Sequence, residues 1–127
     1  MDHRENYIEF VCENTMQLGQ IQSDAYDLVY TSNGVHVWIN DLNAMYQNIS
    51  RVLKTGGRYI MFDIHPFMRP LSSNTEQLIA VKPYDATGPF GEPPTYKWRI
   101  QDLTNALALS GLTHGGNVCR GRGILGR

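Results

Sequence analysis

The side chains best suited to chemistry in this sequence follow two short apolar runs. Residues 26–30 form the first run, which is followed by Thr31, Ser32 and Asn33. Residues 59–64 form the second run, which carries Asp63 near its end and is followed by His65. An imidazole can take up a proton near neutral pH, so His65 is a candidate general base, although a lone histidine at a strand end is more often structural.

Two further residues, His36 and Trp38, come shortly after the first polar group. Together with Asp63 they can form a wall of a substrate pocket, but a tryptophan such as Trp38 is more often a packing residue because an indole ring buries a large apolar area. The residues Thr31–Asn33 can likewise be only a polar connection between a strand and a helix. The sequence shows no paired Cys/His spacing, so we predict no metal site.

A helix between the two apolar runs would hold these groups in place. Over residues 41–54, apolar residues recur every three or four positions: Leu42, Met45, Tyr46, Ile49, Val52 and Leu53. Asn40 can cap the start of this helix, and Gly56-Gly57 can end it in a left-handed conformation. The order of strand, helix and strand over residues 26–66 predicts a parallel βαβ unit, and such sheets bind ligands at the carboxyl ends of their strands.

The segments around this unit differ in character. Residues 7–12 are prone to form a strand, and a second helix is expected from about residue 97 to residue 110. All six prolines lie within residues 66–94, and we interpret residues 66–95 as a lid or insert. Residues 114–127 contain five glycines and three arginines without periodicity. We therefore predict one domain over residues 1–113, followed by a disordered Gly/Arg-rich tail.

The composition excludes several classes of protein. Eleven basic residues nearly balance twelve acidic ones, so the net charge of −1 gives no indication of nucleic-acid binding. The sequence has no signal-peptide core and no apolar run long enough to span a membrane. Cys12 and Cys119 lie far apart without CxxC spacing, which favours a reduced, cytoplasmic protein.

Over roughly residues 7–112 the sequence resembles the class I S-adenosylmethionine-dependent methyltransferases of the type 11-like group. Three segments carry the resemblance: YDLVYTSNGVHVW (26–38), RVLKTGG (51–57) and RYIMFDIHP (58–66). Thr55 stands where the family usually has a proline. The resemblance implies a Rossmann-like parallel sheet, S-adenosylmethionine as the cofactor, and a small molecule as the methyl acceptor.

The resemblance also implies roles for particular residues. Asn14 lies where the family usually has an aspartate that accepts a hydrogen bond from the adenine amino group, and Thr15 follows beside the ring. Asn14 can equally be a turn residue. Thr31–Asn33 would line the methionine end of the cofactor and the methyl-transfer position. Such a transfer depends mainly on alignment of the reactants, which does not require His65 as a base.

The family's first two strands are not found in this sequence. They would supply a glycine-rich turn and a ribose-binding carboxylate, but no GxGxG is present. We also expect the family's C-terminal hairpin to be missing after Leu112. The expected fold is therefore an incomplete Rossmann-like sheet, a parallel βαβ unit with a flanking helix, in a fragment that is inactive alone. A second hypothesis is a non-catalytic module that self-associates through its open strand edges.

Overall fold

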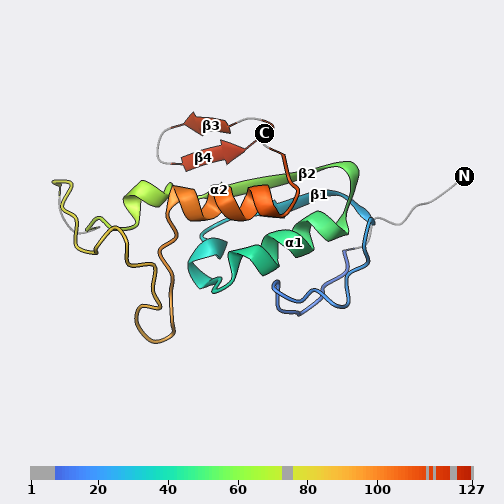
Figure 1. The fold of residues 1–127 in the computed structure, drawn as a ribbon, viewed down its shortest axis with the longest axis horizontal. Helices are drawn as coiled ribbons and strands as arrows, with labels where there is room; N and C mark the ends of the chain where they lie inside the picture. The colour runs from blue at the N-terminus through green and yellow to red at the C-terminus, as the bar shows by residue number, and fades with distance from the viewer. Residues whose placement is uncertain (1–7, 73–75, 114, 116, 121–122, 127) are drawn as a thin grey trace, which may run out of the picture.

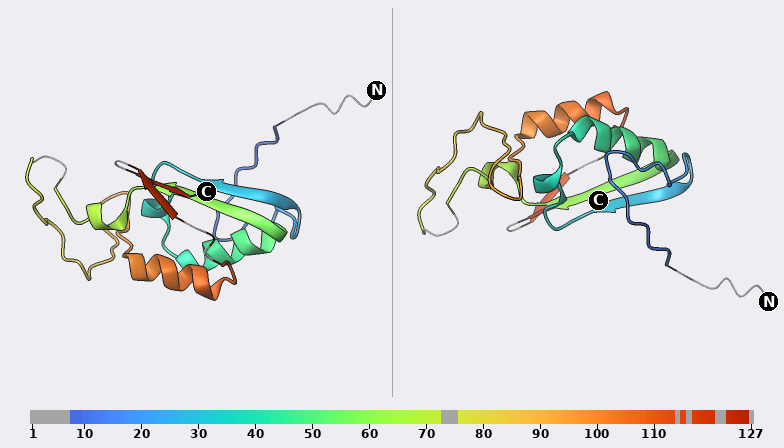
Figure 2. Two further views of the ribbon diagram at one scale, coloured as in Figure 1. Left: turned by 90° about the horizontal axis from the view of Figure 1, so that it is seen from above. Right: turned by 90° about the horizontal axis from the view of Figure 1, so that it is seen from below.

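The computed structural model describes residues 8–72, 76–113, 115, 117–120 and 123–126. Its elements in chain order are β1 (Tyr26–Thr31), η1 (Val35–Trp38), α1 (Leu42–Val52), β2 (Leu53–Asp63), η2 (Pro66–Met68), α2 (Ile100–Leu109), β3 (Asn117–Arg120) and β4 (Gly123–Gly126). Both α-helices lie on one face of a small sheet, and the proline-rich segment extends from one end of the molecule (Figure 1). Two further views show the same arrangement (Figure 2). The chain therefore forms an α/β fold.

The two central strands are parallel and are connected through α1. Leu28 pairs with Arg58 and Tyr30 pairs with Ile60, and the register shifts between Tyr26 and Leu28. A strand, a helix and a parallel strand in this order form the βαβ unit that the sequence predicts. The partial Rossmann-like sheet is therefore confirmed in its parallel part.

The ends of α1 differ from the expectation. Asp41, not Asn40, caps the helix by accepting a hydrogen bond of 3.0 Å from the backbone N–H of Ala44. The helix ends at Val52, and Leu53 already has extended backbone angles and begins β2. The predicted Gly-Gly helix stop was therefore wrong. Gly56 does adopt a left-handed φ of 82°, but within β2, between the pair Tyr26–Leu53 and the regular pairing that starts at Leu28–Arg58.

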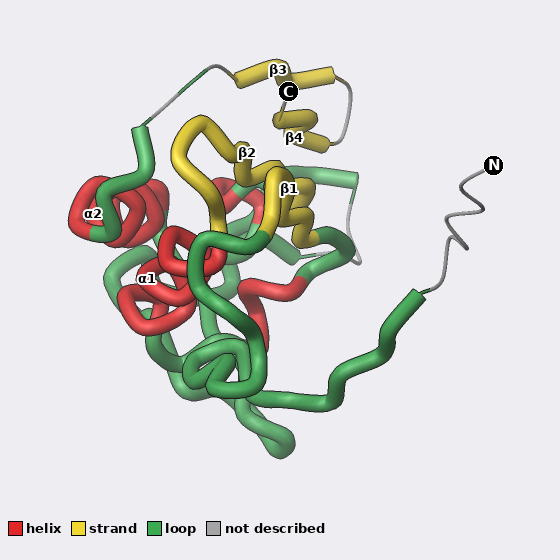
Figure 3. Tube along the Cα trace, turned by 90° about the vertical axis from the view of Figure 1, so that its right-hand side faces the viewer, coloured by secondary structure: helices red, strands yellow, loops and turns green. Residues whose placement is uncertain are grey.

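The core forms where the apolar side of α1 meets β2 and α2. Buried members of this cluster come from α1, β2, α2 and the connection before α1: Ile39, Leu42, Met45, Tyr46, Ile49, Leu53 and Ala106. The side chains with 3.6-residue spacing in α1 are buried because the sheet covers one side of the helix and α2 covers another. Viewed along the strands, the helices and the strands form two layers (Figure 3).

The N-terminal segment does not form the expected strand. Residues 8–14 have no regular structure, with Ile8 78% and Phe10 90% exposed, while Tyr7 lies outside the described residues. A strand needs a neighbour to satisfy its backbone groups, and β1 pairs only with β2 among the described strands. The expected strand was therefore wrong for residues 8–12.

The C-terminal residues form a hairpin that the sequence analysis did not expect. β3 and β4 are antiparallel, and β4 pairs with β2 through Phe62–Leu125 and Asp63–Ile124. The strand order is β1-β2-β4-β3. The expectation that a C-terminal hairpin is missing was therefore wrong for these eight residues. An open strand edge offers unpaired backbone groups, and the aliphatic residues in this tail favour strand pairing with it.

The proline-rich segment has little regular structure. Its isolated bridges join Leu71 to Ala80 and Phe90 to Thr95. The second helix, α2, ends before Gly111, whose φ of 85° is left-handed. Within the described part of the chain, no helix has the length and apolar character needed to cross a membrane.

Candidate functional site

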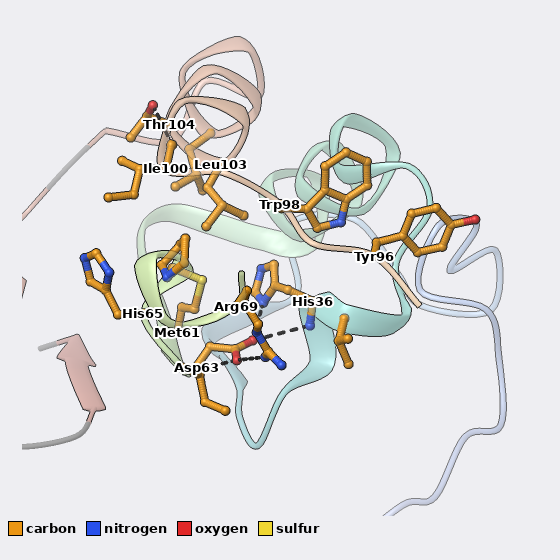
Figure 4. A pocket seen from close by; sticks show the side chains of 14 residues that line it. His36, Met61, Asp63, His65, Arg69, Tyr96, Trp98, Ile100, Leu103 and Thr104 are labelled. Carbon is orange, nitrogen blue, oxygen red and sulfur yellow. Dashed lines mark hydrogen bonds and ion pairs between the residues drawn. The ribbon is translucent and has the colours of Figure 1, made fainter. Parts of the chain in front are cut away.

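A pocket of about 230 Å3 lies where β2 ends, between η1 and α2. Its apolar lining comes from both layers of the fold: Val37, Met61, Ile64, Pro66, Trp98, Ile100, Leu103 and Leu107. Its polar lining includes His36, Asp63, His65 and Arg69. Figure 4 shows Ile100 and Leu103 of α2 on one side, with Asp63, Arg69 and His36 facing them. The pocket is thus at the carboxyl end of a parallel strand, where α/β sheets bind ligands.

The carboxylate of Asp63 joins the elements around this pocket. Its Oδ2 accepts hydrogen bonds from the ring Nδ1 of His36 at 2.9 Å and from the backbone N–H of His36 at 3.3 Å. Its Oδ1 accepts from the backbone N–H of Ile64 at 2.7 Å and from Nη2 of Arg69 at 3.0 Å. Four donors therefore surround one carboxylate whose side chain is only 10% exposed.

This environment determines the charge of Asp63. Burial alone would raise the pKa of the carboxyl group, because it disfavours the charged form. The hydrogen bonds from His36 and Ile64 stabilise that charged form, and the result is a pKa of Asp63 below its ordinary value. Asp63 is therefore ionised at neutral pH and acts as an acceptor only.

His36 links Asp63 to the core. Its Nε2 lies 2.6 Å from the hydroxyl of Tyr46, which is fully buried. Because Asp63 cannot donate, the neutral ring carries its proton on Nδ1 and accepts from Tyr46 at Nε2. If the ring is protonated, Nε2 donates instead and Tyr46 can direct its proton to Sδ of Met61, 3.9 Å away. Burial, with smaller contributions from Tyr59 and Asp63, raises the pKa of Tyr46, so this hydroxyl stays neutral.

His65 lies in a different environment from His36. Its Nδ1 accepts a hydrogen bond of 3.1 Å from the backbone N–H of Phe67 and thereby caps η2. A nitrogen that accepts this bond carries no proton, so in the neutral ring Nε2 is the donor. This structural role agrees with the alternative reading of His65. Its role as a general base stays a prediction.

The polar residues Thr31–Asn33 at the end of β1 do not line the pocket. The hydroxyl of Thr31 lies 2.5 Å from that of Tyr59. Burial raises the pKa of Tyr59 to about 12, although the bond to Thr31 acts in the opposite direction. Ser32 follows Thr31, and the left-handed φ angles of Asn33 (57°) and Gly34 (81°) then turn the chain into η1. The structure therefore brings His36, Asp63 and His65 together and leaves Thr31–Asn33 outside this cavity.

The other predicted site residues also lie outside the pocket lining. Oδ1 of Asn14 accepts from the backbone N–H of Met16 at 2.9 Å, as a turn residue does. The carbonyl of Thr15 accepts from the side-chain amide of Asn48 at 3.3 Å. Trp38 is 56% exposed, so it neither lines the pocket nor packs in the core. The cofactor-binding roles of Asn14, Thr15 and Thr31–Asn33 stay predictions.

These side chains do not build a complete site for S-adenosylmethionine. The Asn14 amide oxygen and the Thr31 hydroxyl, expected to face the cofactor, are both engaged by internal partners. A pocket of about 230 Å3 also lies below the usual range of roughly 300–1,000 Å3 for drug-sized ligands. Among the residues that the structure describes, no three His, Cys, Asp or Glu side chains are grouped as a metal site requires.

Sequence reasoning missed two residues of this network. Arg69 lies in the irregular segment after β2, where no periodicity indicates which side chains turn inward. Tyr46 was assigned to the apolar side of α1, which is correct, but its hydroxyl also bonds to His36. A tyrosine within an apolar helical stripe is itself a signal, because its hydroxyl needs a partner when buried.

The comparisons with known proteins concern the fold and the N-terminal half of the chain. Residues 1–61 match the family model of the methyltransferase domain. No curated protein matched the chain. The fold is similar to a crystal structure of an S-adenosylmethionine dependent methyltransferase from Mesorhizobium loti, with a TM-score of 0.60 and 20% sequence identity. The similarity covers 72% of this chain and 46% of the other, so this chain spans less than half the length of its structural neighbour.

Proposed function

We propose that this chain belongs to the class I S-adenosylmethionine-dependent methyltransferases and that its pocket receives a small-molecule methyl acceptor; the match of residues 1–61 to the methyltransferase domain and the similar fold support this proposal. The position of the pocket at the carboxyl end of β2, beside the loop after β1, is the observation that supports this proposal. Ligands of α/β sheets bind at this edge because loops and helix ends converge there. The mostly apolar lining and the volume of about 230 Å3 favour a compact acceptor.

The pocket proposal can be tested by filling the cavity. Leu103 lines the pocket on α2, whereas Leu109 on the same helix is 73% exposed. Small apolar fragments should shift the NMR signals of the His36 and His65 rings in the unmodified chain. Leu103→Trp should abolish these shifts, and the matched control Leu109→Trp should retain them. Shifts that persist in Leu103→Trp would contradict the proposal.

The cofactor of this family is S-adenosylmethionine, and we propose that this chain supplies only the acceptor side of its site. The 127 residues contain no GxGxG, and two of the expected cofactor contacts are made internally. We therefore expect the polypeptide alone to bind the cofactor weakly and to have little activity. Calorimetric titration should show no saturable binding at micromolar concentrations. One-to-one binding with a micromolar Kd would overturn this expectation.

The proline-rich residues 66–95 are the proposed determinant of acceptor choice. Pro66 and Arg69 from this segment line the pocket, and Tyr96 and Trp98 follow at its end. Loops at the ligand edge of a sheet commonly cover the bound molecule. Exchanging this segment between relatives should change acceptor preference in a methyl-transfer assay. An unchanged preference would reject this role.

A second candidate function is self-association through β1. Among the described strands, β1 pairs only with β2, and its side chains Tyr26, Leu28 and Tyr30 are 44%, 54% and 58% exposed. An unpaired edge with apolar side chains favours pairing with another strand. Light scattering over a concentration series should then approach twice the chain mass of 14.4 kDa. The variant Leu28→Lys should prevent this increase, whereas a constant monomer mass would reject the hypothesis.

The proposed compartment is the cytoplasm. Cys12 is exposed and is a free thiol in the structure. Free exposed thiols persist where glutathione keeps proteins reduced. Cell fractionation followed by thiol labelling tests this proposal, and recovery of an oxidised, secreted form would contradict it.

A further inference from the structure

We infer that the pocket selects a small molecule with an apolar body and one carboxylate, and that Arg69 binds this carboxylate. The inference rests on the proposed function, because it names the chemical class of the acceptor. It is carried by the hydrogen-bonding state of the polar groups around the pocket. Most of them are already engaged, and those with spare capacity are donors.

The acceptor groups of the pocket are occupied. Asp63 accepts four hydrogen bonds, from His36 twice, from Ile64 and from Arg69. The hydroxyl of Thr104 donates to the carbonyl of Ile100 at 2.9 Å within its own helix, and in Figure 4 its oxygen points away from Asp63 and Arg69. A ligand that needs protein acceptors for its own N–H or O–H groups therefore finds few of them here.

Several donor groups are also committed. Both ring nitrogens of His36 have partners, in Asp63 and Tyr46. Nε1 of Trp98 donates to the carbonyl of Ile39 at 2.8 Å. In Figure 4 the hydroxyl of Tyr96 points away from Asp63 and Arg69. These groups shape the pocket but offer no donor to a ligand beside Arg69.

Arg69 retains most of its capacity to donate hydrogen bonds. A guanidinium has five N–H groups, and Arg69 uses Nη2 for the bond to Asp63 at 3.0 Å. Its other nitrogens have no partner in the part of the chain that the structure describes, and its side chain is 23% exposed. The planar guanidinium matches a carboxylate with two parallel hydrogen bonds. Asp63 stays negatively charged, but Arg69 balances this charge, and three further N–H groups of His36 and Ile64 surround the carboxylate.

His65 supplies a second donor at the same cavity. The bond from Phe67 N–H to Nδ1 leaves the proton of the neutral ring on Nε2. Both polar groups with spare capacity, Arg69 and His65, therefore present N–H groups. A carboxylate is the common small-molecule group that only accepts hydrogen bonds and also carries the opposite charge to Arg69.

The remainder of the pocket suits an apolar body. Met61, Ile100, Leu103 and Leu107 line it. Figure 4 shows Ile100 and Leu103 across the cavity from Arg69. A ligand with its carboxylate on Arg69 would place its apolar body against α2, where burial of apolar surface contributes affinity.

The experiment compares heptanoate with heptanamide, which share a shape but differ in charge. Binding to the full chain is followed by NMR titration at constant ionic strength. We expect heptanoate to bind about tenfold more tightly, since hydrogen bonds to a charged group are stronger than those between neutral groups. Arg69→Gln should remove this preference, so that heptanoate and heptanamide bind this variant with equal affinity. Arg69→Lys should retain part of the preference, because it keeps the charge but loses the paired geometry.

The matched control is Arg58→Gln. Arg58 is an exposed arginine on β2 outside the pocket lining, so the variant loses the same charge without touching the cavity. It should keep the full preference for heptanoate. The ratio of the two affinities within one variant does not depend on the folded fraction, so partial unfolding of Arg69→Gln does not obscure the result. If the unmodified chain binds heptanoate and heptanamide with equal affinity, the inference is overturned, and no variant is needed to show it.

The outcomes also separate this inference from the proposed function. If both compounds bind equally and Leu103→Trp blocks both, the acceptor pocket stands and the carboxylate preference is wrong. If heptanoate is preferred but Leu103→Trp does not affect it, binding occurs elsewhere and the inference is wrong. If neither compound binds, both proposals fail. Methyl transfer is not needed for any of these measurements.

Discussion

The ring nitrogen Nδ1 of His36 lies 2.9 Å from Oδ2 of Asp63 and joins the loop after β1 to the last residue of β2. The side chains of both residues are nearly buried, at 8% and 10% exposed. This contact holds two walls of the pocket at a fixed separation, because Asp63 also accepts the backbone N–H of His36. The network continues from Asp63 to Arg69 and from His36 to Tyr46.

The first prediction concerns the charge of Asp63. Asp63→Asn should reduce the free energy of unfolding at pH 7 by about 2–4 kcal/mol, because it removes a buried charge that has four donors. Urea unfolding measures the change. The control Asp27→Asn removes an 87% exposed carboxylate, 3.6 Å from Lys54, and should change stability by less than about 0.5 kcal/mol. Equal effects of the two variants would contradict the prediction.

The same carboxylate predicts a pH dependence. The pKa of Asp63 is lowered in the folded protein, so folding stabilises the ionised form. This contribution is complete above the ordinary aspartate pKa of about 4 and is lost as the pH falls through the folded-state pKa. The stability difference between the unmodified chain and Asp63→Asn should therefore shrink between pH 5 and the acid limit of folding. A difference that does not vary with pH would reject this assignment.

A further prediction about this hydrogen-bond network concerns Tyr46. Tyr46→Phe removes the hydroxyl that lies 2.6 Å from Nε2 of His36 and leaves a buried nitrogen without its partner. The free energy of unfolding should fall by about 1–3 kcal/mol. Tyr30→Phe is the matched control, since Tyr30 is 58% exposed and should tolerate the change. The hydrogen bond would be shown to be unimportant if both variants unfold at the same urea concentration.

Arg51 should hold the N-terminal turn segment against α1. It donates to the carbonyls of Leu18 at 2.7 Å and Ile21 at 2.9 Å, and to the hydroxyl of Ser23. Arg51→Met should speed amide hydrogen exchange of residues 17–24 about tenfold. In this variant the segment can open locally without breaking the three hydrogen bonds from Arg51. Arg58→Met, on an exposed arginine, should leave this exchange unchanged. Unchanged exchange in Arg51→Met would show that the segment is held by other contacts.

Gly57 is predicted to be the less replaceable of two adjacent glycines. A Cβ at Gly57 would lie 2.8 Å from the carbonyl oxygen of Lys54 and 3.2 Å from that of Tyr26. Gly57→Ala should therefore cost about 1–3 kcal/mol in unfolding free energy. Gly56 has open space around it and a φ of 82°, which asparagine tolerates, so Gly56→Asn should cost less. Urea unfolding of the two variants tests the order, and the reverse order would refute the steric argument.

Part of the fold follows from local sequence. The 3.6-residue spacing of apolar residues in α1 and the apolar runs of β1 and β2 predict the βαβ unit, because each element must bury one side. The strand expected at residues 8–12 failed for a non-local reason, since its backbone groups have no strand beside them. The hairpin of β3 and β4 depends on the open edge of β2, which lies more than fifty residues earlier in the chain.

The sequence by itself determined the parallel βαβ unit and the polar residues at its carboxyl end, because both depend on short-range periodicity. Only the tertiary structure decided which of those residues meet. His36 and Asp63 are 27 residues apart and come together because β1 and β2 are parallel neighbours. Arg69 and the side chains of α2 complete the pocket through packing that no local pattern encodes. The physical reason is that periodicity reports which side of an element is buried, whereas a site requires particular atoms from several elements at hydrogen-bonding distance.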